Sequence, residues 1–345
     1  FMEFTEIDGD FMEGGGSIVR LAVAFSAITK KPIIVDNIRA KRQNPGLKTQ
    51  HLEAIKSVKR LCSGELRGDM LNSTKIEFIP NEITKRQIKI QIDTCGSIGL
   101  VLQCLFLPAF FSKKRTVVEI KGGGTMGLNA PNLLYTKNVF LPLLNKMGFN
   151  VDIKIQKHGF YPKGGADVIV NIDPVKEITP LKLIERGKLK CIKGVSIASS
   201  ELKKSNVAER QAGAAKRILG KKYIEPLIIE ELYFDTNSIG SGILLIAEFE
   251  NTIIAWDALG ERGKSSDVVG MEAAHGLIKQ LMSSATIDDY AVDQLIPYMA
   301  LCKEESKIKF NELTLHSKTN LELLKKFIDF EYSVDGNELR IKKLS

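Results

Sequence analysis

Residues 8–51 bring together the side-chain types that bind phosphate. Three consecutive glycines, Gly14–Gly16, lead into an apolar run, and a loop rich in arginine and lysine follows. Glycines let backbone N–H groups approach a ligand closely, and a helix N-terminus adds further N–H donors. Arginine guanidinium groups match phosphate oxygens in pairs. The stretch therefore predicts a phosphate site, and its candidate ligands are Arg20, Arg39, Arg42 and His51. One of these arginines could instead pair with a nearby aspartate.

Glu13 is the carboxylate directly beside the three glycines. A carboxylate next to bound phosphate suits a hard cation such as Mg²⁺, which bridges to phosphate oxygens and keeps few protein ligands. An exposed loop glutamate without any ligand explains Glu13 equally well. The role of His51 also has two explanations: it either donates to phosphate or caps the helix that starts beside it.

His316 is the candidate nucleophile among the four histidines of the chain. It lies just before a helix that we expect to begin near Asn320, with Ser317 and Thr319 as caps. A neutral imidazole nitrogen can attack an electrophile such as a phosphorus centre. From the residues alone, a half-buried histidine bonded to its own turn is the favoured alternative. His158 and His275 are expected to have structural roles.

Polar groups inside apolar segments indicate a further binding surface. Gln103 lies within LVLQCLF, where a buried amide needs a partner that a nucleotide could supply. Asp293 and Gln294 follow Tyr290 in an amphipathic segment and could bind a ribose or a base, although polar groups on a helix surface need no ligand. Neither glycine run matches a P-loop or a dinucleotide-binding fingerprint, because the required lysine or glycine spacing is missing.

Composition and charge narrow the class of protein. A net charge of +8 favours a polyanionic partner, although the excess is modest for 345 residues. The five cysteines include no Cys-x-x-Cys pair, so neither a disulfide framework nor a thiolate zinc site is expected. No apolar stretch is long enough to span a membrane, and the first residues lack a targeting pattern. The sequence predicts a cytoplasmic protein with no membrane contact, and leaves a homodimer open.

An internal repeat organises the chain. Gly16-Ser17-Ile18 opens one apolar helix, and Gly96-Ser97-Ile98 opens another. Each helix is followed by a β-branched strand, an irregular loop, a second helix (49–62 and 132–148) and further strands, and the order recurs after residue 288. The pattern predicts an α+β protein with three repeated units of two helices and a four-stranded sheet, at about 1–90, 91–183 and 274–345. Residues 184–273 differ and predict a smaller inserted α/β domain.

The repeats also make a geometric prediction. Loops at equivalent positions should lie on the same face of each unit and meet at one cleft. Three such loops carry the groups described above: the cationic loop 39–51, a glycine loop with Gly122–Gly124 and Asn129, and the segment with His316.

Six ordered blocks between residues 8 and 320 resemble the RNA 3'-terminal phosphate cyclase family. They are DGDFMEGGGSIVR, IRAKRQNPGLKTQH, CGSIGL, HGFYPKGGADV, YAVDQL and TLHSKTN. One departure is Ala166, which replaces the last glycine of the family's Pro-x-Gly-Gly-Gly turn. We expect it to cause only a small local change.

The resemblance implies a fold and a reaction. The fold would be a large domain of three repeats similar to the C-terminal domain of bacterial initiation factor three, with a thioredoxin-like insertion. The enzyme would be an ATP-dependent ligase that converts an RNA 3'-terminal phosphate into a 2',3'-cyclic phosphate. A histidine nitrogen would attack the α-phosphate of ATP, and AMP would pass to the RNA phosphate. The 2'-hydroxyl would then displace AMP.

The resemblance also implies roles for individual residues. His316 matches the adenylated histidine, and Glu13 matches an acid linked to a divalent metal, Mg²⁺ or Mn²⁺. The implied ATP-binding positions are Gln103, Tyr290, Ala291, Val292, Asp293 and Gln294. The implied contacts to the RNA phosphate are Arg20, Arg39, Arg42, Gln50 and His51.

Two other functions compete with the cyclase reading. One is a non-catalytic RNA-binding factor of the ribosome-assembly type, which lacks the nucleophile. The other is an enzyme similar to enolpyruvyl transferases, whose domains also consist of repeated α/β units. The presence of His316 favours the cyclase over the first of these.

Overall fold

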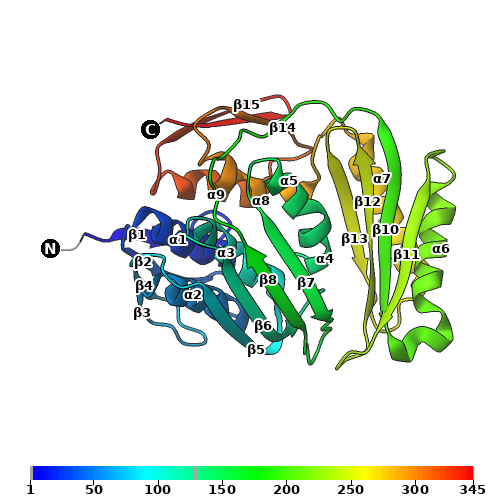
Figure 1. The fold of residues 1–345 in the computed structure, drawn as a ribbon, viewed down its shortest axis with the longest axis horizontal. Coiled ribbons are helices and arrows are strands. Elements are labelled where there is room, and N and C mark those ends of the chain that lie inside the picture. Colours follow the sequence, from blue (N-terminus) through cyan, green and yellow to red (C-terminus); the bar gives the residue numbers. More distant parts are fainter. Residues whose placement is uncertain (1–2, 128–129, 345) are drawn as a thin grey trace.

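The α+β class expected from the sequence is confirmed by a computed structural model, which describes residues 3–127 and 130–344. The described chain forms four four-stranded sheets with helices packed against them (Figure 1). Asn129, predicted to lie on the glycine loop, is outside the described residues. None of the described helices has the length and apolar character needed to cross a membrane.

The first sheet has the strand order β1-β2-β4-β3. Its first pair is parallel and its other two pairs are antiparallel. Inward-facing residues alternate along the strands, as Ile76 and Phe78 do in β4, and two helices cover this face. The elements are β1 (Thr5–Asp8), α1 (Gly16–Thr29), β2 (Ile33–Asp36), α2 (Thr49–Cys62), β3 (Glu65–Arg67) and β4 (Ile76–Ile79).

The second sheet has the order β5-β6-β8-β7, again with one parallel pair followed by two antiparallel pairs. Its elements are β5 (Gln87–Ser97), α3 (Ile98–Phe110), β6 (Thr116–Gly124), α4 (Leu133–Tyr135), α5 (Leu141–Asn145), β7 (Val151–Lys157) and β8 (Asp167–Ile172). The helix predicted over 132–148 is present over 133–145, but it is not α-helical throughout. A π-helical turn at Thr136–Phe140 lies between α4 and α5, where Pro142 has no N–H to continue an α-helical ladder.

The third sheet combines strands that lie far apart in the chain, in the order β9-β14-β16-β15. β9 pairs in parallel with β14, although β9 lies within the stretch that the sequence assigned to 91–183. The elements are β9 (Lys182–Leu183), α8 (Asp289–Met299), β14 (Ser306–Lys309), α9 (Leu315–Leu324), β15 (Phe330–Asp335) and β16 (Glu338–Lys343). The remaining pairs of this sheet are antiparallel.

The fourth sheet, β11-β10-β12-β13, has its own apolar cluster and is called the inserted unit below. Helix α7 packs on α6, β12 and β13, so the predicted boundary at 273 falls inside an element of this unit. Its elements are β10 (Leu189–Ser199), a 3₁₀ turn (Ser200–Ser205), α6 (Val207–Leu219), β11 (Leu227–Phe234), β12 (Ser241–Phe249), β13 (Ile253–Leu259) and α7 (Ser266–Met282).

Arg186, just before the first strand of the inserted unit, is hydrogen-bonded to the end of its last helix. Its guanidinium donates to the carbonyl oxygens of Gln280 and Leu281 at the end of α7, and to that of Ala285 just beyond it. These carbonyls have no helical partner, and the cation complements the negative end of the helix dipole. The chain therefore enters and leaves the unit at one point.

The helices of the three other sheets pack against one another in the interior. Helix α1 contacts α3 and α9, and α8 contacts α9, so residues from both ends of the chain share one core (Figure 1). The inserted unit lies beside this core, with β13 facing α8 and the π-helical turn. The N-termini of α1 and α9 consequently come close to one another, as the 3.6 Å between Glu13 and His316 shows.

Asp288, the N-cap of α8, joins three segments. Its buried carboxylate accepts the hydroxyl of Tyr135 at 2.5 Å, the N–H of Ala255 in β13 at 3.0 Å, and the N–H groups of Tyr290 and Ala291 at 3.1 Å. Four donors thus converge on a side chain that water does not reach.

Replacement of Asp288 by alanine should lower the free energy of unfolding by about 3 kcal/mol, because it leaves buried donors without an acceptor. Asp288→Asn keeps one carbonyl oxygen and should cost less than half as much. Urea denaturation of the two variants measures both values. A loss below about 1 kcal/mol in Asp288→Ala would show that water replaces the carboxylate.

Candidate active site

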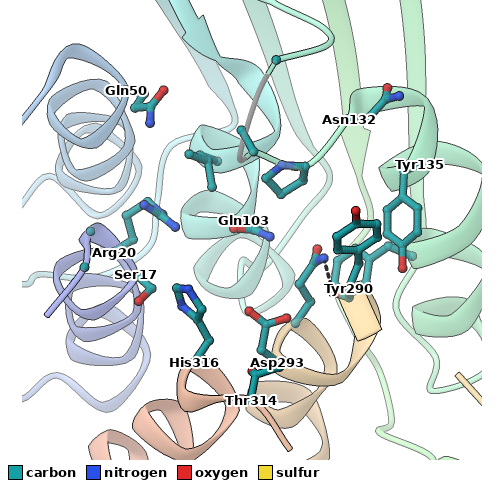
Figure 2. A pocket seen from close by; sticks show the side chains of 18 of the residues that line it. Ser17, Arg20, Gln50, Gln103, Asn132, Tyr135, Tyr290, Asp293, Thr314 and His316 are labelled. Carbon is teal, nitrogen blue, oxygen red and sulfur yellow. Dashed lines mark hydrogen bonds between the residues drawn. The ribbon is translucent and has the colours of Figure 1, made fainter. Parts of the chain in front are cut away.

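A cavity of about 900 Å³ lies between the interior helices and the inserted unit (Figure 2). It brings together eleven of the thirteen residues named from the sequence, spanning positions 13 to 316. They are Glu13, Arg20, Arg39, Arg42, Gln50, His51, Gln103, Tyr290, Asp293, Gln294 and His316.

Two of the named residues do not line the cavity. Ala291 and Val292 are fully buried on the opposite side of α8, where they join the main core. Helical periodicity explains the split, because Tyr290, Asp293 and Gln294 are three and four positions apart and share one face. Any contact of a ligand with Ala291 or Val292 would have to involve the backbone.

The three glycines of the predicted glycine loop do not line the cavity, although Gly127, Ala130 and Pro131, which follow them in the same loop, do. Gly122–Gly124 form the end of β6 and pack on the turn that contains Pro162 and Ala166. The N–H of Gly122 donates to the carbonyl of Ala166 at 2.8 Å, and the N–H of Ala166 donates back to Gly123 at 3.3 Å. A Cβ on Gly159 would lie 2.3 Å from the Gly123 carbonyl oxygen. These glycines therefore serve close backbone packing, and the methyl group of Ala166 is buried there.

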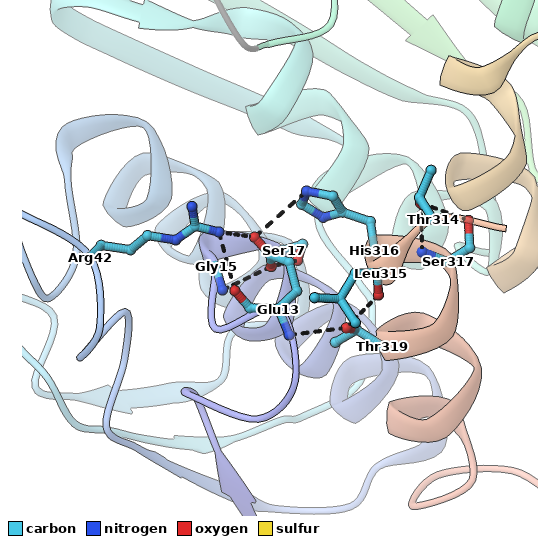
Figure 3. A network of polar contacts seen from close by, with 9 residues as sticks. All are labelled: Glu13, Gly15, Ser17, Arg42, Thr314, Leu315, His316, Ser317 and Thr319. Carbon is cyan, nitrogen blue, oxygen red and sulfur yellow. Dashed lines mark hydrogen bonds and ion pairs between the residues drawn. The ribbon is translucent and has the colours of Figure 1, made fainter. Parts of the chain in front are cut away.

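The carboxylate of Glu13 is the centre of a polar network (Figure 3). Its Oε2 accepts the N–H of Gly15 at 2.8 Å and the hydroxyl of Ser17 at 3.1 Å. Its Oε1 pairs with Arg42 and lies 3.6 Å from Nε2 of His316. With only 6% of its side chain exposed, Glu13 is not the free loop residue that the sequence left open.

His316 lies in the first turn of α9, rather than before it as predicted. The cap is Thr314, whose hydroxyl accepts the N–H of Ser317 at 3.2 Å, so the expected caps Ser317 and Thr319 are wrong. The hydroxyl of Thr319 instead accepts the N–H of Glu13 at 3.3 Å and donates to Leu315 at 2.7 Å. The half-exposed imidazole thus faces the cavity from a helix that is hydrogen-bonded to the loop containing Glu13.

Arg20 is a buried guanidinium that faces the cavity (Figure 2). Burial lowers its pKa, and the surrounding groups, including Cys104, Glu13 and Asp293, oppose that shift. No carboxylate of the described residues forms an ion pair with it, in contrast to Arg42. A buried charge without a partner is unfavourable, so this position needs an anionic ligand.

His51 is a neutral donor in the same wall. Its Nδ1 accepts the N–H of Lys48 at 3.1 Å, which leaves the proton on Nε2. A Cβ at Gly16 would lie 2.1 Å from that Nε2, so only glycine fits there. Burial, together with the charges of Arg20, Arg39 and Lys48, lowers the pKa of His51 to about 3. The capping alternative is therefore present in the structure.

Two other residues of the cationic loop form hydrogen bonds with backbone groups. Arg39 donates to the carbonyls of Asn44 and Gly46 at 2.7 and 2.8 Å, which shapes the loop. The amide oxygen of Gln50 accepts the N–H of Ser97 at 3.1 Å and leaves its NH₂ group available. This end of the cavity therefore presents mainly donors.

The opposite end presents an aromatic ring and acceptors. Tyr290 lines it, and burial raises the pKa of the neighbouring Asp293 carboxyl against the charges of His316 and Arg20. Three residues that line the cavity each have one buried acceptor atom without a donor among the described residues: Asp289 Oδ1, Gln294 Oε1 and Asn320 Oδ1.

Sequence reasoning missed the contribution of the inserted unit to the cavity. Residues of β13, the following loop and α7 line it: Trp256, Asp257, Ala258, Leu259, Glu261, Lys264 and Glu272. The one available signal is that Trp256 is the sole tryptophan of the chain. Asn132 and Tyr135 were also missed, because the fold alone brings them beside Asp257 and Asp288.

A model of the family described as RNA 3'-terminal phosphate cyclase matches residues 11–334. The chain belongs to this family. The RNA 3'-terminal phosphate cyclase of Thermococcus kodakarensis is 41% identical over 335 residues, which cover 97% of this chain and 96% of the relative. The proteins of the same name from Sulfurisphaera tokodaii and Ignicoccus hospitalis are 40% and 37% identical, with at least 95% of each chain covered.

The membership of the chain in the cyclase family confirms the resemblance drawn from the six sequence blocks. Five of the blocks contribute residues to the cavity, and the HGFYPKGGADV block does not. That block instead supports the end of β6.

The depressed pKa of His51 makes stability depend on pH. In the unfolded chain the ring binds a proton near its ordinary pKa of 6.5, whereas in the folded chain it stays neutral down to about 3. The contribution of the neutral His51 ring to the free energy of unfolding is complete above pH 6.5 and is lost as the pH falls toward 3. Between pH 6 and 4 the wild type should lose about 1.4 kcal/mol per pH unit more than His51→Gln. Urea denaturation across this range tests it, with exposed His275→Gln as control. Parallel curves for wild type and His51→Gln would contradict the assignment.

Proposed function

We propose that the chain is an ATP-dependent RNA 3'-terminal-phosphate cyclase. The observation that carries the proposal is the position of His316, a half-exposed imidazole in the wall of a cavity with two chemically different ends. One end presents the unpaired Arg20, and the other presents the aromatic ring of Tyr290. A nucleotide triphosphate matches both, because its phosphates are anionic while its base can stack on an aromatic ring.

The reaction proposed for His316 has three steps. A ring nitrogen attacks the α-phosphorus of ATP, the bond to the β-phosphate oxygen breaks, and pyrophosphate leaves. An oxygen of the RNA 3'-phosphate then attacks the same phosphorus and frees the histidine. Finally the 2'-hydroxyl attacks the activated 3'-phosphorus, loses its proton, and AMP leaves from a 2',3'-cyclic phosphate. The adenylate makes the intramolecular step feasible because it is a good leaving group.

The base of ATP and the RNA 3'-phosphate are proposed to occupy opposite ends of the cavity. We place the base and ribose of ATP against Gln103, Tyr290, Asp293 and Gln294, which line this part of the cavity. We place the RNA 3'-phosphate against the donor-rich end, which includes Arg20, Arg39, Arg42, Gln50 and His51. Since guanidinium groups bind phosphate in fixed pairs of hydrogen bonds, the arginines orient the phosphate as well as attract it.

A divalent cation fits beside Glu13 only if nucleotide phosphates and water supply most of its ligands. The described residues contain no group of three or more metal-ligating side chains. Glu13 offers Oε1, and Arg42, which now pairs with that oxygen, is exposed enough to turn away. Mg²⁺ or Mn²⁺ bound there would neutralise phosphate charge. The residues of this chain then hold the carboxylate through Gly15 and Ser17.

The sheet topology supports a more specific fold description. The first three sheets share one order of parallel and antiparallel pairs, which fits three copies of one unit, similar to the C-terminal domain of initiation factor three. We place the third copy at 181–183 joined to about 284–344, and the inserted unit between them. The helices α6 and α7 on its mixed sheet fit a thioredoxin-like arrangement.

Incubation with ATP radiolabelled at the α-phosphate, followed by denaturation, should leave an acid-labile, base-stable label on the wild type. His316→Ala should acquire none, whereas His275→Ala should be labelled normally, because His275 lies on α7 and does not line the cavity. An RNA-binding factor of the ribosome-assembly type, or an enolpyruvyl-transferase-like enzyme, would form no adduct. A wild type that remains unlabelled with Mg²⁺ and with Mn²⁺ would overturn the proposal.

Arg42 and Arg20 should both affect use of the RNA 3'-phosphate. Arg42→Ala should raise KM for the RNA 3'-phosphate about tenfold, the cost of one charge-assisted contact, while leaving self-adenylation nearly intact. Arg20→Lys should keep RNA binding partly, because it keeps a charge but loses the paired donors. Steady-state cyclisation and single-turnover labelling separate the two effects. Equal loss of both steps in Arg42→Ala would show that this arginine acts mainly through Glu13.

A further inference from the structure

The ring of Tyr290 contacts two aromatic rings outside its own helix. Tyr290 occupies the first turn of α8, is 39% exposed, and projects into the cavity (Figure 2). One face of its ring stacks on Trp256, with centroids 4.7 Å apart and planes 23° apart. Tyr135 meets it edge-on at 5.8 Å. With 39% of the residue exposed, the tyrosine still offers surface to a ligand in the cavity.

Trp256 is itself fixed by a glycine. Behind the indole lies α7, and a Cβ added to Gly276 would fall 2.0 Å from Cδ1 and 2.1 Å from Nε1 of the tryptophan. Any side chain at position 276 would therefore displace the ring. The contacts run without a break from α7 through Trp256 to Tyr290.

The strand that carries Trp256 also holds the helix that carries Tyr290. Ala255, next to Trp256 in β13, donates its N–H to the Asp288 carboxylate at 3.0 Å, and Asp288 caps α8. Asp257, on the other side of Trp256, accepts from Asn132 at 3.3 Å. The position of the indole relative to Tyr290 is thus set by hydrogen bonds on both sides.

We propose that the inserted unit takes part in nucleotide binding through Trp256, a positioning residue that holds the Tyr290 ring ready to stack on the base of ATP. The inference rests on the proposed function in that ATP is the ligand. The inserted unit then forms the rear wall of the base site. An aromatic ring that is already fixed loses little conformational freedom when a second aromatic system stacks on it.

The sole tryptophan of the chain makes this arrangement directly observable. Its ring lies one aromatic layer from the base, so titration with ATP should produce a saturable change in intrinsic fluorescence without any label. Guanosine triphosphate serves as the comparison nucleotide. A fluorescence signal that does not respond to ATP, in a wild type that becomes labelled by ATP, would overturn the proposal.

Two variants remove the support by different routes. Trp256→Ala deletes the stack, and Gly276→Ala keeps the tryptophan but pushes it from α7. Each should raise the ATP concentration for half-maximal self-adenylation by roughly three- to tenfold, the range expected for one aromatic pair. KM for RNA 3'-phosphate should stay unchanged, and Trp256→Phe should recover most of the loss.

Gly213→Ala is the matched control, because it makes the same change in α6 of the same unit and its Cβ meets only Arg217 at 3.6 Å. It should leave ATP use at the wild-type level. If folded Trp256→Ala and Gly276→Ala keep wild-type half-saturation, or if both substrates suffer equally, Trp256 is a structural residue only. Absence of label in the wild type would instead sink the cyclase function, and the fluorescence titration would then decide separately whether Trp256 borders a nucleotide site.

Discussion

The carboxylate of Glu13 is the interaction on which the arrangement of the site depends. It accepts hydrogen bonds from Gly15 and from Ser17 in α1, and it pairs with Arg42 of the cationic loop. It also lies 3.6 Å from the imidazole of His316. Its own N–H is held by Thr319 of α9. Residues that are 306 positions apart are thereby brought into one network. A glycine loop alone would bind anions, but it would not align them with a nucleophile.

The second constraint is the difference between the two ends of the cavity. Arg20, Gln50 and His51 offer N–H groups at one end, whereas Tyr290 presents an aromatic ring at the other. Burial makes the unpaired charge of Arg20 costly, so an anionic group is favoured at that end. A ligand with negative charge at one end and an aromatic group at the other is therefore selected for its orientation as well as its composition.

Residue patterns predicted the α+β class and most of the cavity, because both depend on local features. Helix 49–62 was predicted with its observed bounds, since its apolar spacing and flanking signals agree. Thr314 was missed as the cap of α9 because Ser317 and Thr319 are equally good capping residues. Ala291 and Val292 were carried over as a run of sequence, whereas a helix presents only some of those residues on one side. Trp256 could not be found, because its role comes from the packing of the inserted unit on α8.

The clamp made by Arg186 has a consequence for the order of folding. The first strand of the third sheet is synthesised long before its partner, as the bond between Leu181 and Ser306, 125 positions apart, illustrates. Closing so long a loop is entropically expensive and slow. Once the inserted unit has folded and Arg186 joins its two ends, only a short loop has to be closed to pair β9 with β14. The third sheet is therefore expected to form after the inserted unit has folded, because the folded unit brings the two parts of that sheet close together.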